Sequence, residues 1–166
     1  MDPRKLKEMK KVVDAVLKAG KRFYKTFEGR TYSTGVIGEL LVTQGILETY
    51  GKDLCSKNDN DIQFKGSCIQ NFDIIFNLKG SKFKINAKAT TTYNKENAPE
   101  WVRQHAKTYM NIEFKKNGTQ SCSEKTDCDE TLFYVFVDVK KWLDKSKTDF
   151  YILSNKEANN PNLTFS

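Results

Sequence analysis

Apolar side chains recur at helical spacing near the start of the chain and alternate with polar ones further along. The helical spacing predicts an amphipathic helix over residues 4 to about 27 and a second helix over about 33–49. Ser33 or Thr34 is the predicted cap of the second helix, and Gly51 its predicted stop. A polar stretch then leads to a short predicted strand at 62–64.

Strict alternation over residues 72–89 predicts a β-hairpin, with its turn at Gly80 and Ser81. Side chains of a strand point alternately to its two faces. Asp73 therefore lies on the polar face of the first strand, and Asn86 and Lys88 lie on the polar face of the second. A two-residue turn at this position sets Asp73 opposite Lys88 and diagonal to Asn86.

The second half of the chain alternates between apolar runs and polar segments. A short helix is predicted within 94–105, and 115–130 is polar enough to be an exposed excursion. The run 132–139 is apolar on both faces, which predicts a central strand covered on both sides. A short helix around Trp142 and a last strand at 150–153 complete the order.

The length of the chain fits one domain. Its 166 residues, 38% of them hydrophobic, favour a single α/β or α+β domain with a real core. We divide the domain, 1–166, into a basic N-terminal helix (1–30), a core (33–153) and a tail without chemical signal (154–166).

Charge and cysteine spacing narrow the classes of partner. The net charge of +7, with lysine far commoner than arginine, favours an anionic partner such as nucleic acid. The four cysteines form no paired CxxC spacing and His105 is distant from them in sequence, which argues against zinc. No apolar run is long enough to span a bilayer, and the amino terminus lacks the apolar centre of a signal peptide. We therefore expect a soluble, cytoplasmic protein without a membrane partner.

Three side chains have the chemistry that phosphodiester hydrolysis needs. Carboxylates hold Mg²⁺, which polarises the phosphate and activates a water molecule, and a nearby cation assists the attack. Asp73 and Lys88 are the right types, and Glu39 lies inside an apolar helix segment where an unpaired carboxylate would be costly to bury. The alternative is a half-buried sheet with ordinary charge pairs on its wet face and a glutamate at an exposed helix edge.

At these residues the chain resembles the PD-(D/E)XK nuclease superfamily. The matching features are a helix bearing a glutamate (GELLVTQGI, Glu39), an aspartate at the start of a strand (NFDIIF, Asp73) and a lysine late in the next strand (INAKAT, Lys88). The resemblance covers about 33–153 and implies an α/β fold, a restriction-endonuclease-like central mixed β-sheet flanked by helices. It also implies that Asp73 is the main metal ligand, that Glu39 holds metal or water, and that Lys88 orients the attacking water.

Asn86 departs from the family pattern, which has glutamate, aspartate or sometimes glutamine at this position. An amide oxygen coordinates Mg²⁺ but carries no charge, so a site with Asn86 as auxiliary ligand should bind metal more weakly. Two origins remain open. The asparagine is either a natural variant compensated by Glu39 or Asp61, or an aspartate replaced to disable the enzyme.

Candidate DNA contacts follow the hairpin. Hydroxyls and a lysine there suit phosphates, and an arginine and a glutamine further on suit base edges. These residues are Thr90, Thr91, Tyr93, Lys95, Arg103 and Gln104. The first helix has a basic surface, which is either a solvated face or an attraction for DNA that salt would weaken. Its basic residues include Lys5, Lys7, Lys10, Lys11, Lys18, Lys21, Arg22 and Lys25.

Together with these residues, the resemblance implies a DNA endonuclease that uses Mg²⁺, with Mn²⁺ as a substitute, and acts in restriction of foreign DNA. Repair and junction resolution stay open as roles. A DNA-binding module that has lost catalysis is the first rival, and a protein-interaction domain with an incidental basic surface is the second. Cutting both strands of a duplex needs two sites, which favours a homodimer.

Overall fold

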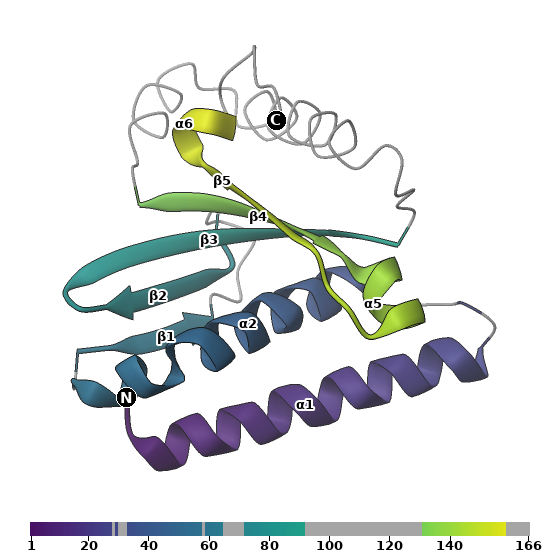
Figure 1. The fold of residues 1–166 in the computed structure, drawn as a ribbon, viewed down its shortest axis with the longest axis horizontal. Coiled ribbons are helices and arrows are strands. Elements are labelled where there is room, and N and C mark those ends of the chain that lie inside the picture. Colours follow the sequence, from purple (N-terminus) through teal and green to yellow (C-terminus); the bar gives the residue numbers. More distant parts are fainter. Residues whose placement is uncertain (28, 30–32, 58, 65–71, 92–130, 159–166) are drawn as a thin grey trace.

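Helices and strands follow one another in nearly the predicted order. The computed structural model describes residues 1–27, 29, 33–57, 59–64, 72–91 and 131–158 (Figure 1). The predicted helix within 94–105 and the predicted excursion at 115–130 lie outside these residues. The described elements are α1 (Pro3–Thr26), α2 (Thr34–Ser56), β1 (Asp61–Phe64), β2 (Ile74–Leu78), β3 (Ser81–Thr90), β4 (Leu132–Asp138), α5 (Val139–Lys145), β5 (Phe150–Ser154) and α6 (Asn155–Ala158).

The strands form one mixed sheet of five strands in the order β1-β2-β3-β4-β5. β3 and β4 are parallel, and every other neighbouring pair is antiparallel. The chain therefore has the α/β class and the central mixed sheet that the sequence predicts. β4 lies between β3 and β5, as expected for a run that is apolar on both faces.

The hairpin turn lies one residue earlier than predicted. Lys79 and Gly80 are its two central residues, and both have positive φ, 52° and 83°. Positive φ at both positions is typical of a type I′ turn, whose twist suits a two-residue hairpin. Leu78 pairs with Ser81 and Ile74 with Ile85. The register is therefore shifted by two residues, and the predicted pairing of Asp73 with Lys88 is wrong.

The second helix begins as predicted but continues past its predicted stop. Ser33 is its cap, because the hydroxyl accepts a hydrogen bond from the backbone N–H of Val36 at 3.4 Å. Gly51 is buried inside α2 rather than ending it, and a Cβ there would lie 3.2 Å from the Nζ of Lys10 on α1. The glycine thus allows α1 and α2 to approach each other, and α2 ends only at Ser56.

α2 packs between α1 and the sheet (Figure 1). It lies tightly against the sheet at Gly38, where an added Cβ would lie only 2.4 Å from the Cβ of Ala89 on β3. No side chain fits at position 38 without displacing the helix from the strand. The core around this contact draws its buried residues from α1, α2, α5 and the sheet, among them Val13, Leu17, Ile37, Leu41, Leu47, Leu54, Ile62, Ile74, Val137 and Leu143.

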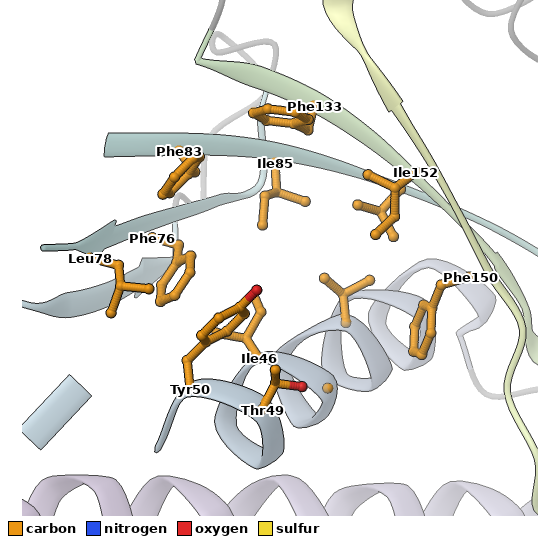
Figure 2. A pocket seen from close by; sticks show the side chains of 13 residues that line it. Ile46, Thr49, Tyr50, Phe76, Leu78, Phe83, Ile85, Phe133, Phe150 and Ile152 are labelled. Carbon is orange, nitrogen blue, oxygen red and sulfur yellow. The ribbon is translucent and has the colours of Figure 1, made fainter. Parts of the chain in front are cut away.

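An apolar pocket of about 450 Å³ remains between α2 and the sheet (Figure 2). Aromatic side chains from five elements line it: Tyr50, Phe76, Phe83, Phe133 and Phe150. The hydroxyl oxygens of Tyr50 and Thr49 are the polar atoms drawn at its α2 side (Figure 2). None of the sequence-predicted site residues lines this pocket, and its walls lack the carboxylates that a metal needs. In the part of the chain described, every helix is too short or too polar to cross a membrane.

Candidate functional site

Asp73 is held at the point where β2 begins beside β3. Its backbone N–H donates to the carbonyl of Ile85 at 2.8 Å, although Ile74 already pairs with Ile85. Two residues thus oppose one, which is the arrangement of a β-bulge and re-aims a side chain at a strand end. The Oδ2 atom of Asp73 accepts a hydrogen bond from the backbone N–H of Ala87 at 2.7 Å. At this position the Asp73 carboxylate, rather than a backbone carbonyl of β2, accepts the hydrogen bond from β3.

The same hydrogen bond brings Asp73 to the other two residues of the hairpin site. Ala87 is the residue between Asn86 and Lys88, so the Asp73 carboxylate lies at the backbone amide that separates them. Asn86 and Lys88 point to the same side of the sheet, because they are two residues apart on one strand. Asn86 is only 3% exposed and Lys88 is half-buried. Both are fixed by pairing with β4, to Tyr134 and Phe136.

Glu39 reaches the site from α2. It follows Gly38, where the helix lies tightly against β3, and its side chain is half-buried. Burial raises the pKa of the Glu39 carboxyl, and the nearby negative charge of Asp73 raises it further. Two carboxylates from different elements thus lie near each other, and the negative charge of Asp73 disfavours the charge of the half-buried Glu39. A proton or a cation would relieve this repulsion.

The raised pKa of Glu39 makes a prediction about stability. Because the folded state binds this proton more tightly than the unfolded state, stability falls as pH rises above the ordinary glutamate pKa of about 4.3. Glu39→Gln removes the titration and should therefore be more stable than the wild type at neutral pH. Melting temperatures of the two proteins, measured from acidic to neutral pH, should coincide at the acidic end and diverge above it. Parallel curves would show that Glu39 is not under electrostatic strain.

The predicted DNA contacts are only partly visible. Thr90 is 7% exposed and pairs with Asp138 of β4, while Thr91 is half-buried beyond the end of β3. The remaining four, Tyr93, Lys95, Arg103 and Gln104, lie outside the described residues.

Asp61, which the sequence offers as compensation for Asn86, lies elsewhere. It pairs with Asn77 near the turn of the hairpin, and its Oδ1 accepts a hydrogen bond from the Nζ of Lys5 at 3.3 Å. Asn77 in turn pairs with Lys82, four residues before Asn86 on β3. Glu39 is therefore the better placed of the two carboxylates.

One acidic residue near this face was not predicted from the sequence. Asp138 is completely buried at the end of β4, and its Oδ1 accepts a hydrogen bond from the backbone N–H of Lys141 at 2.8 Å. Its Oδ2 is buried and has no hydrogen-bond partner among the described residues, and burial raises the pKa of the carboxyl. The signal was present, since an aspartate after an apolar strand and before a helix predicts a cap. We assign Asp138 the capping of α5.

The donor set at Asp73 fits a hard cation such as Mg²⁺. Glu39 and Asp73 supply carboxylate oxygens, and Asn86 supplies a buried amide oxygen, the ligand types that Mg²⁺ takes. Within the described ranges, no three His, Cys, Asp or Glu residues are grouped to hold a metal. The described residues bring two carboxylates near each other, those of Glu39 and Asp73.

Only the residues of this chain indicate its function, because comparison with known proteins finds no relative. No family model matches the chain, and no match is found among curated proteins or solved structures. The geometry that remains is specific: a carboxylate re-aimed by a bulge, an amide and a lysine flanking its anchoring N–H, and a second carboxylate brought in by a close helix–strand contact.

Proposed function

We propose that the protein is a Mg²⁺-dependent DNA endonuclease of the PD-(D/E)XK type, acting in restriction of foreign DNA. The observation that carries the proposal is the hydrogen bond from the Ala87 N–H to Asp73, which holds the carboxylate at the backbone of the residue between Asn86 and Lys88, with Glu39 close by. The order of a glutamate-bearing helix, an antiparallel hairpin and a further parallel strand supports a restriction-endonuclease-like fold.

Each residue then has a defined task. Asp73 and Glu39 hold the cation, and Asn86 adds a neutral oxygen. Mg²⁺ supplies charge stabilisation to the phosphate and lowers the pKa of the attacking water. Lys88, which lies two residues after Asn86 on β3, orients that water. The net positive charge of the chain, +7, favours the approach of the polyanionic substrate.

The direct test is nicking of a supercoiled plasmid by the purified protein. Nicks should appear with Mg²⁺ or Mn²⁺ and be absent with a chelator. A protein that shows no nicking with either metal, at low salt and high protein concentration, would contradict the proposal. Linear products would favour restriction, whereas preferential cutting of branched DNA would favour repair or junction resolution.

Asn86 favours one second candidate, a nuclease-fold module that binds DNA without cutting it. The amide is neutral and 3% exposed where the resemblance implies an acid, so the site lacks one negative charge. This candidate predicts retention on DNA that falls steeply with salt, and no cleavage. The outcome depends on whether Glu39 compensates for the missing charge.

Restoring that charge gives a prediction. Asn86→Asp adds a carboxylate of nearly the same shape, so Mg²⁺ should bind more tightly and plasmid cleavage should rise by at least ~10-fold. The added charge also increases repulsion in the metal-free protein, so Mg²⁺ should raise the melting temperature more in Asn86→Asp than in the wild type.

Asn77→Asp is the matched control. It makes the same substitution in the same hairpin, but near the turn, where Asn77 pairs with Lys82. Its cleavage and its response to Mg²⁺ should equal those of the wild type. If Asn86→Asp and Asn86→Glu both leave cleavage unchanged, Asn86 does not belong to the site.

A further inference from the structure

The positive charge of the chain is concentrated on α1. This helix carries nine of the 28 basic side chains but only two of the 21 acidic ones. Its surplus of seven equals the net charge of the whole chain, +7, so the rest of the chain is balanced. Such a concentration creates a local potential that attracts an anionic partner.

Three of these nine cations are used inside the protein. Lys5 contacts Asp61 of β1 at 3.3 Å, and the Nζ of Lys10 lies over Gly51 of α2. Lys21 donates to the carbonyl of Trp142 at 3.1 Å and lies over its ring. Burial, and then the charge of Lys25, lowers the pKa of Lys21. These lysines dock α1 onto its neighbours.

The other six cations all point outward and lie along one side of the helix. Their spacing of three, four or seven residues keeps them within a stripe about 60° wide. We call them the cation row: Arg4, Lys7, Lys11, Lys18, Arg22 and Lys25, all exposed. At 1.5 Å per residue the row is about 32 Å long, close to one turn of B-DNA at roughly 34 Å.

The two acidic residues of α1 do little to neutralise the row. Asp14 lies between Lys11 and Lys18, where the row has no cation. Its Oδ1 accepts a hydrogen bond from the Nε2 of Gln44 at 3.0 Å and is thereby held toward α2. Glu8 is 3.9 Å from Lys11, and both are well exposed, so the pair is weak. The row therefore presents nearly its full charge to solvent.

We propose that the cation row binds the phosphate backbone of duplex DNA, which deepens and rests on the function proposed above. The charges form a line rather than a plane, and their line is as long as one helical turn of duplex. A flat anionic membrane fits less well, because the exposed apolar side chains of α1, Val12 and Val16, lie more than about 100° around the helix from the centre of the row. The row supplies affinity without sequence readout.

The test measures binding of the full chain to a short fluorescent duplex without divalent metal, over a series of salt concentrations. The triple variant Lys7→Gln, Lys18→Gln, Lys25→Gln should bind at least ~10-fold more weakly at low salt. The slope of log affinity against log salt should fall by about 0.9 for each phosphate that the variant no longer neutralises. An unchanged slope would overturn the proposal.

A control variant separates the row from net charge. Lys52→Gln, Lys82→Gln, Lys147→Gln removes the same charge from exposed positions outside α1. It should keep the wild-type salt slope, and an equally reduced slope in this control would overturn the proposal. Binding of the protein to phosphatidylserine vesicles that depends on the row, together with row-independent DNA binding, would assign the row to a membrane instead.

Cleavage distinguishes failure of this inference from failure of the proposed function. The plasmid assay is run on the wild-type protein at low salt with Mg²⁺, and the binding assay is run without divalent metal, so the two are read separately. Row-dependent DNA binding without any cleavage would contradict the endonuclease and leave the row intact. Cleavage together with DNA binding that does not depend on the row would contradict the proposal for the row and leave the proposed endonuclease intact.

Discussion

Asp73→Asn is expected to abolish Mg²⁺-dependent cleavage and to leave the fold intact. The amide oxygen of asparagine can still accept the hydrogen bond from the Ala87 N–H, now 2.7 Å from Oδ2, so the bulge keeps its anchor. The variant removes only the charge that holds the cation. Loss of an outer partner of a metal ligand already costs roughly 10–100-fold, so loss of the main ligand should exceed about 100-fold. Plasmid nicking measures the effect, and circular dichroism checks the fold.

Two companion variants make the result specific. Asp61→Asn repeats the substitution in β1, where the carboxylate pairs with Lys5, and should cut DNA like the wild type. Lys88→Met keeps the length of the side chain and should lose cleavage while keeping the Mg²⁺-induced rise in melting temperature. Full activity in Asp73→Asn would remove this residue from the mechanism, whatever the companions do.

The faces of the hairpin could be predicted although its register could not. Gly80 and Ser81 suggested the turn, because a glycine readily takes positive φ, whereas Lys79 takes φ 52° in the structure. The error shifts the pairing by two residues, and an even shift leaves the side chains of the regularly paired residues on their predicted faces. Asn86 and Lys88 thus keep their common face, while the partner of Asp73 changes from Lys88 to the backbone of residues 85–87.

The role of a glycine is difficult to predict from the sequence alone. Glycine is common both at helix ends and where two helices pack closely, so Gly51 was predicted to end the helix. Only the position of α1 in the structure shows that Gly51 makes a close helix–helix contact instead. The bulge at Asp73 has no local signal, since it depends on where β2 begins to pair with β3. The half-buried state of Glu39, in contrast, follows from its apolar neighbours, and its proximity to Asp73 needs the three-dimensional packing.

That packing depends on Gly38. Gly38→Ala places a Cβ 2.4 Å from the Cβ of Ala89, and neither atom can rotate away, because both are attached directly to the backbone. The helix must move off the strand, at a cost of about 1–3 kcal/mol for overpacking. Because Glu39 is the next residue, its carboxylate moves away from Asp73. A displacement of about 1 Å can cost on the order of 100-fold in rate.

A second change should rescue the first. Ala89→Gly removes the atom that Gly38→Ala meets, so the double variant should recover most of the stability and cleavage that Gly38→Ala loses, although glycine in a strand costs about 0.5–1 kcal/mol by itself. Gly35→Ala is the control on the same helix, where an added Cβ meets nothing within 4 Å. Because Gly35 is exposed in the first turn of α2, the stability of this control should stay within about 0.5 kcal/mol of the wild type and its cleavage should be unchanged. The wild type, the two single variants and the double variant form a double-mutant cycle, with Gly35→Ala as the control. Denaturant unfolding measures their stability and plasmid nicking their cleavage. If the effects of Gly38→Ala and Ala89→Gly simply add, the helix–strand contact does not position Glu39.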